Sequence, residues 1–186
     1  MTSQPASPVR TITPGAGAPI SAVERWLVSA NRSVLVVLLG VMAALVIANV
    51  MCRYLVGISF PWVEEVSRYM MVWAAFLGAG PALRVGGHIA IETLPNALPE
   101  RAARVLRAAL VLVMAATLLT TVWIGAEYTQ FGWEQETPVL GWSAGTVYLA
   151  IPIGAALALV HLAFVARQWI RSGEWERVEG FDPQAL

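Results

Sequence analysis

Residues 53–88 read RYLVGISFPWVEEVSRYMMVWAAFLGAGPALRVGGH, which sets a charged and aromatic cluster between two strongly apolar runs. Bilayer-length segments normally exclude charge, because a charged side chain at mid-membrane costs about 2.5–3.5 kcal/mol or more. The charged residues Arg53, Glu64, Glu65 and Arg68 stand where one apolar run ends and the next begins. We therefore expect them near a membrane surface, paired with each other or with a partner.

Around this stretch the chain is unusually apolar, with 58% hydrophobic and 13% charged residues. Its four long apolar runs are Val34–Cys52, Val66–Leu83, Val105–Ile124 and Val147–Val165. At a rise of about 1.5 Å per residue, a helix of this length crosses a hydrocarbon core of about 30 Å. The sequence predicts an all-α membrane protein whose domain, residues 23–170, has four transmembrane helices at about 34–54, 63–83, 103–124 and 146–166.

The arginines indicate an orientation for these spans. Ten of the twelve precede the first span, lie between the second and third, or follow the fourth. Arg53 and Arg68 are the two on the other side, which also holds Glu64, Glu65, Glu127, Glu134 and Glu136. Because cytoplasmic loops are enriched in arginine, we expect both termini in the cytoplasm of a bacterium, with the protein in its inner membrane.

Three segments outside the spans have their own predictions. The Pro- and Ser-rich residues 1–22 and the last residues, 171–186, are expected to be cytoplasmic tails, the first of them flexible. The first apolar run is long for a cleaved signal peptide and is interpreted as an uncleaved anchor. Residues 88–98 are too short to cross the membrane, and they are expected to form either an interfacial segment or a plain loop before Pro99.

The charged cluster has a bland and a functional interpretation. Pro61 suits the first helical position, and carboxylates in the first turn suit the helix dipole. Glu64 shares a helix face with Arg68, Glu65 shares one with Tyr69, and Arg53 can join them across a short loop. The cluster is either a solvated helix cap or a docking surface for another polypeptide. Adjacent carboxylates point apart on a helix, so we expect no acid–base catalysis and no enzyme.

Other residues could belong to a haem, metal or nucleic-acid site, but most of the sequence features argue against such sites. His88 and His161 could ligate haem between helices, but they differ in depth, and His161 is expected to be a packing residue hydrogen-bonded to another helix. One cysteine, Cys52, excludes an internal disulfide and a cysteine-based metal cluster, so we expect neither metal nor cofactor. A net charge of zero gives no electrostatic case for nucleic acid.

Small residues and polar residues inside the spans complete the picture. Ala74 with Gly78, and Gly154 with Ala158, have the small-xxx-small spacing that lets helices approach closely, either within this chain or against another membrane subunit. No acidic residue falls in the middle of a span. Ion and proton pathways usually need such groups, so the chain is not expected to move a solute alone.

The ordered set of motifs resembles the small membrane subunit, the DctQ family, of tripartite ATP-independent periplasmic (TRAP) transporters. The resemblance covers about Trp26 to Ile170. It rests on Arg53-Tyr54, Pro61-Trp62, Glu64-Glu65, Arg68-Tyr69, Trp73, Phe76-Leu77-Gly78-Ala79, Arg84, His88-Ile89, Thr137-Pro138, Tyr148-Leu149 and Ile151-Pro152-Ile153-Gly154.

The resemblance implies a non-catalytic scaffold subunit of a sodium-coupled symporter. A large membrane subunit would carry the substrate and sodium sites, and a periplasmic binding protein would deliver an organic acid. The candidate subunit contacts are Arg53, Trp62, Glu64, Glu65, Arg68, Trp73 and Gly78. The alternative function is a haem- or quinone-binding membrane anchor of an oxidoreductase.

Overall fold

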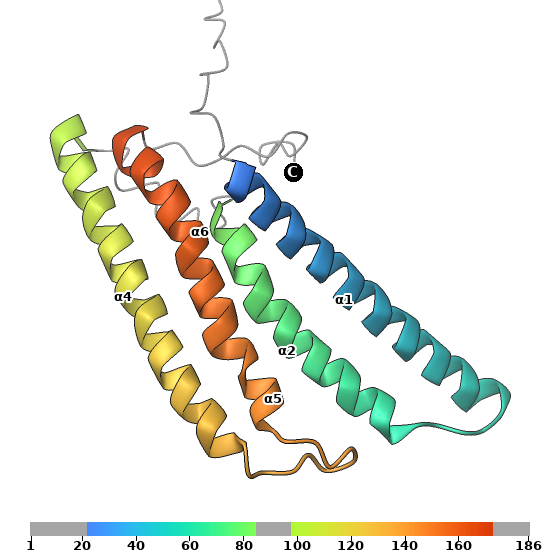
Figure 1. The fold of residues 1–186 in the computed structure, drawn as a ribbon. Coiled ribbons are helices and arrows are strands. Elements are labelled where there is room, and N and C mark those ends of the chain that lie inside the picture. The colour runs from blue at the N-terminus through green and yellow to red at the C-terminus, as the bar shows by residue number, and fades with distance from the viewer. Residues whose placement is uncertain (1–21, 85–97, 173–186) are drawn as a thin grey trace, which may run out of the picture.

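The computed structural model describes residues 22–84 and 98–172, which form helices joined by short connections. The helices are α1 (Ala22–Leu55), α2 (Pro61–Arg84), α4 (Glu100–Gly132), the single turn α5 (Gly145–Tyr148) and α6 (Ala150–Ser172). Figure 1 shows the four long helices side by side, in the order α4, α6, α2, α1. Each long helix packs on its neighbours in this row, so the described helices form a layer rather than a closed bundle.

Three of these helices are long and apolar enough to cross a membrane: Ala22–Leu55, Glu100–Gly132 and the continuous segment Gly145–Arg171. α1 has 34 residues, or about 50 Å at 1.5 Å per residue, and so exceeds the hydrocarbon core. α2 has 24 residues but carries Glu64, Glu65, Arg68 and Arg84. Three of the four predicted spans thus correspond to candidate membrane helices, and α2 as the fourth stays a prediction.

The contact between α2 and α6 is close because glycines stand at the crossing points. A Cβ atom on Gly154 of α6 would come within 2.5 Å of the Cβ atom of Phe76 on α2. In the opposite direction, Gly80 of α2 faces the ring of His161 on α6. The small residues of α6 therefore serve packing within this chain, as Ala155 and Ala158 also do with exposures of 3% and 0%.

α4 packs on the other side of α6 through glycines of its own. Gly125 lies against Ile151 and Pro152, and Gly132 lies against the ring of Tyr148. The residue numbers run in opposite directions along the two helices, so α4 and α6 are antiparallel. Pro152, two residues after the start of α6, sits where a helix tolerates proline.

Two connections close the end of the layer where the charged cluster lies. Between α1 and α2, the Asn49 side-chain oxygen accepts a hydrogen bond from the Phe60 amide at 2.8 Å, and Gly57 takes a positive φ of 75°. Pro61 then begins α2, as expected of a proline at the first helical position. The second connection, residues 133–144, folds back on itself around Thr137, whose amide donates to the Trp142 carbonyl at 2.7 Å.

Several sequence predictions fall on residues outside the described ranges. These are the N-terminal tail, the segment 88–98 except its last residue, and the C-terminal tail beyond Ser172. His88 also belongs to this group, so its place relative to His161 stays open.

Candidate functional site

The predicted contact residues gather at the end of the layer that holds the two short connections (Figure 1). Arg53 lies in the last turn of α1, and Trp62, Glu64, Glu65 and Arg68 occupy the first two turns of α2. Trp73 and Gly78 lie farther along α2. These residues fall into separate groups with different environments.

Arg53 and Glu64 form an exposed ion pair across the α1–α2 connection. The Arg53 guanidinium lies 2.6 Å from the Glu64 carboxylate, with side-chain exposures of 49% and 58%. The sequence suggested Glu64 with Arg68 as a same-face pair, whereas the structure pairs Glu64 with Arg53 instead. An exposed pair of this kind contributes about 0–1 kcal/mol to stability.

Glu65 has a different environment, although it is the next residue along the chain. It is 4% exposed, and its carboxylate accepts a hydrogen bond from the Tyr69 hydroxyl at 2.5 Å. The same carboxylate accepts a hydrogen bond from the Val139 amide at 2.9 Å. Glu65 therefore fastens the 133–144 connection to α2, a contact across 74 residues that its sequence neighbours do not reveal.

Thr137-Pro138, one of the motifs quoted above, is part of the same arrangement. The Thr137 side chain is 6% exposed, and its hydroxyl accepts a hydrogen bond from the Trp142 amide at 3.0 Å. Pro138 disfavours a helical backbone at Thr137, and the amide of Val139, the residue after this proline, donates to Glu65. The motif thus has a structural role in seating the connection on α2.

Arg68 lies on a groove between α1 and α2 and is exposed. The groove has a volume of about 530 Å³, and Glu64, Ser67 and Arg68 are its polar residues. Among the residues that the structure describes, no carboxylate lies within ion-pair distance of Arg68. The Ser67 hydroxyl is buried without a hydrogen-bond partner in the same part of the chain.

The three remaining candidates differ in how much surface they offer. Trp62 is 41% exposed and lies beside Phe60, with ring centroids 6.4 Å apart. Trp73 is half-buried. A Cβ atom on Gly78 would meet nothing within 4 Å, in contrast to Gly80 and Gly154. Gly78 is therefore not used for packing among the described helices.

A polar cluster that was not predicted from the sequence lies at the opposite end of the layer. His161 of α6 is fully buried, with Nδ1 3.4 Å from Arg84 of α2 and Nε2 3.5 Å from Asn31 of α1. Asn31 also donates to the Leu77 carbonyl at 3.1 Å, and Arg84 forms an ion pair with Glu24. These contacts join three neighbouring helices, and they agree with the prediction that His161 hydrogen-bonds another helix.

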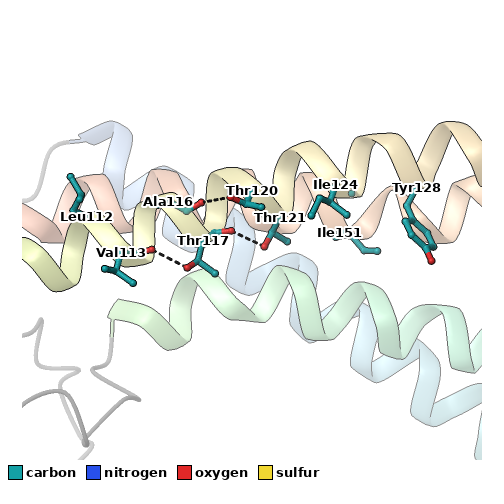
Figure 2. A pocket seen from close by; sticks show the side chains of 10 residues that line it. Leu112, Val113, Ala116, Thr117, Thr120, Thr121, Ile124, Tyr128 and Ile151 are labelled. Carbon is teal, nitrogen blue, oxygen red and sulfur yellow. Dashed lines mark hydrogen bonds between the residues drawn. The ribbon is translucent and has the colours of Figure 1, made fainter.

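A second groove follows α4 and reaches Ile151 of α6, and Figure 2 shows its lining. It has a volume of about 650 Å³ and is mostly apolar, with three threonines and the ring of Tyr128. The hydroxyls of Thr117, Thr120 and Thr121 donate to the carbonyls four residues earlier, at 2.8–2.9 Å. The threonine hydroxyls are thus already hydrogen-bonded within α4.

Comparison with known proteins identifies relatives over most of the chain. The sequence model described as "Tripartite ATP-independent periplasmic transporters, DctQ component" matches residues 42–172. A Haemophilus influenzae protein named as a TRAP transporter small permease is 30% identical over 123 residues, 64% of this chain and 74% of that protein.

Two further relatives carry names that include a solute. The ectoine TRAP transporter small permease protein TeaB of Halomonas elongata is 27% identical over 136 residues, 71% of this chain and 70% of that protein. The C4-dicarboxylate TRAP transporter small permease protein DctQ of Rhodobacter capsulatus is 31% identical over 142 residues, 73% of this chain and 60% of that protein. These names describe transporter subunits rather than enzymes, and they do not favour a haem- or quinone-binding anchor. Together with the three apolar helices, they indicate a multi-pass membrane protein.

Proposed function

This chain belongs to the family of DctQ components of TRAP transporters and is the small subunit of such a transporter, and we propose that it acts as a scaffold that binds no solute itself. In this proposal a large membrane subunit carries the substrate and sodium sites. A periplasmic binding protein delivers an organic acid to the assembly. The C4-dicarboxylate in the name of the Rhodobacter capsulatus relative supports an organic acid as the class of solute.

The observation that carries the scaffold role is the state of the polar side chains within the helices. The α4 threonines bond their own helix, and Asn49 of α1 bonds the Phe60 amide. Solute and ion sites in membranes use side chains or backbone groups that are free to coordinate the ligand. Polar groups that are already satisfied by their own backbone support a structural function for this subunit.

The layered arrangement supports association with a larger membrane protein. A row of four helices leaves two broad faces that its own helices do not cover (Figure 1). On one edge of this surface, Arg68 and the Ser67 hydroxyl lack partners within the described residues. We propose that the α1–α2 groove, with Arg68, Trp62 and the open side of Gly78, contacts the large subunit.

The orientation follows the arginine distribution. We propose four spans with α2 as the second, both termini in the cytoplasm, and the Arg53–Glu64 pair at the periplasmic surface of the inner membrane. α2 lies alongside its neighbours α1 and α6, which supports its assignment as the second span (Figure 1). The polar cluster of His161, Arg84 and Asn31 then lies toward the cytoplasmic side.

The test of the proposed function separates solute binding from solute uptake. Calorimetry of the isolated chain with C4-dicarboxylates and sugar acids should show no saturable heat. Deletion of the subunit should abolish or strongly reduce sodium-dependent uptake, while the binding protein keeps its affinity for the solute. Saturable binding by the isolated chain would overturn the scaffold role, and a Soret absorbance of the purified chain would favour the oxidoreductase anchor.

A further inference from the structure

Arg107 of α4 is a buried arginine, and one nitrogen of its guanidinium group lacks a hydrogen-bond partner. The residue is 6% exposed, and its Nη1 atom has no hydrogen-bond partner among the residues that the structure describes. Buried polar groups in proteins are nearly always hydrogen-bonded, and a buried charge needs an opposite charge or a set of acceptors. Arg107 therefore requires an acceptor that the described part of the chain does not supply.

Helix geometry places Arg107 beside the last turns of α6. Eighteen residues separate Arg107 from Gly125, which is five full turns, so both residues lie on the α4 face that packs on α6. Gly125 contacts Pro152, and eighteen residues after Pro152 comes Ile170. Since the two helices are antiparallel, Arg107 is level with Arg167 and Arg171, both of which are exposed.

The charges at this end of the layer are mostly positive. α4 contributes Arg101, Arg104 and Arg107, and α6 adds Arg167 and Arg171. The described acidic residues at this end already have partners, since Glu100 bonds Arg104 at 3.1 Å and Glu24 pairs with Arg84. An anion that approached Arg107 would meet attraction from several arginines and no unpaired carboxylate among the described residues.

We propose that Arg107 binds the phosphate of an anionic phospholipid, with the exposed Arg167 and Arg171 of α6 beside the headgroup. A guanidinium is the side chain best suited to bidentate phosphate binding, and basic pockets between membrane helices hold anionic headgroups. Arg107 comes seven residues after the start of α4, or about 10 Å along the axis, a depth near the headgroups. Its neighbours Val105 and Leu112 are 71% and 72% exposed, as residues that face lipid are.

A phospholipid fits this position better than a side chain of another subunit. Arg107 is 6% exposed, so a slim group such as a phosphate reaches it more easily than a protein surface does. The proposed orientation, with both termini in the cytoplasm, places the bound phospholipid in the inner leaflet. The site itself does not depend on that orientation or on the transport function.

The test compares lipid retention by the full chain purified in detergent. Native mass spectrometry would measure binding of dioleoylphosphatidylglycerol against dioleoylphosphatidylcholine. Wild-type protein should prefer the anionic lipid, and Arg107→Gln should weaken this binding about tenfold. Arg101→Gln is the matched control, because it removes the same charge from an exposed position on the same helix and should change binding less than about twofold.

Further measurements test whether the group that Arg107 binds is something other than a lipid phosphate. Inorganic phosphate at matched ionic strength should leave lipid retention unchanged, and full competition by phosphate would replace the lipid with a soluble anion. Equal losses in Arg107→Gln and Arg101→Gln would reduce the effect to general surface charge and overturn the site. Normal lipid retention with loss of the large subunit in Arg107→Gln would assign the acceptor to a protein carboxylate.

A folding defect would not hide the result. Arg107→Met fills the same space without charge, and buried charges are often replaced by apolar residues without loss of stability. This variant should fold as the wild-type protein does, and it should lose the preference for phosphatidylglycerol over phosphatidylcholine. If Arg107→Met keeps that preference, Arg107 does not bind the headgroup.

Discussion

Glu64 and Glu65 show how two neighbouring carboxylates can have unrelated roles. Glu64 faces solvent and pairs with Arg53, whereas Glu65 is buried and holds both the Tyr69 hydroxyl and the Val139 amide. Adjacent residues on a helix point about 100° apart, so this division follows from the geometry of α2. The consequences of removing each carboxylate should therefore differ sharply.

Glu65→Ala should release the 133–144 connection from α2. The variant removes the acceptor of the Val139 amide, whose hydrogen exchange should become faster by about tenfold or more. Glu64→Ala is the matched control on the same turn and should leave that exchange rate unchanged. An unchanged Val139 amide in Glu65→Ala would show that this hydrogen bond does not hold the connection.

The Arg53–Glu64 pair can be tested by exchanging its charges. Arg53→Glu or Glu64→Arg alone places like charges 2.6 Å apart in the original geometry, which disfavours that contact. The double variant restores an ion pair and should recover complex yield with the large subunit if either single variant lowers it. The thermal stability of the isolated chain should change by no more than about 1 kcal/mol, because the pair is exposed. A larger loss of stability would mean that the pair is desolvated.

At the scale of elements, glycine positions separate contacts within the chain from surfaces left open. Phe76 of α2 occupies the space beside Gly154, while no described residue occupies the space beside Gly78. The sequence spacing of small residues was the same on both helices and could not distinguish these two uses. The distinction depends on which helix faces which, and that is set by tertiary packing.

Gly154→Ala should destabilise the α2–α6 contact, and Gly78→Ala should not. The new methyl group at position 154 meets the Phe76 backbone and Cβ atom, so overpacking should cost about 1–3 kcal/mol of unfolding free energy. Thermal unfolding of the two purified variants in detergent would measure this difference. Equal stability of both variants would contradict the close α2–α6 approach.

Other element-level features could be predicted from the sequence to different degrees. The long apolar runs and the proline at position 61 indicated the helices and the start of α2, because length and local propensity decide these features. The attachment of Val139 to Glu65 and the His161–Arg84–Asn31 cluster could not be predicted, since they join residues from distant parts of the chain. Asn31, Glu24 and Arg84 are polar residues near span ends. From the sequence, such residues could equally well be exposed at the membrane surface or buried between helices.

On the scale of the whole molecule, the row of helices and the arginine distribution lead to a topology that can be measured. Reporter fusions after residues 60 and 135 should report the periplasm, and a fusion after residue 95 should report the cytoplasm. The fusion after residue 95 also tests whether α2 crosses the membrane. A cytoplasmic signal from the fusion after residue 135 would reverse the proposed orientation.

The layer also explains why a subunit of this kind would work with a partner. Its helices bury few large side chains against each other, and the fully buried ones include Trp169 and His161 on α6, one of the two inner helices of the row. The outer helices α1 and α4 present apolar side chains on most of their surface. Lipid or a larger membrane subunit must cover these surfaces, and the scaffold role assigns part of them to the large subunit.

The most direct test of the scaffold role is reconstituted transport. Proteoliposomes would contain the large subunit with or without this chain, together with the binding protein, an imposed sodium gradient and a labelled organic acid. The account predicts uptake when this chain is present, and little or none when it is absent although the large subunit is inserted in equal amount. Undiminished uptake by the large subunit alone would contradict the claim that this chain is a required part of the transporter.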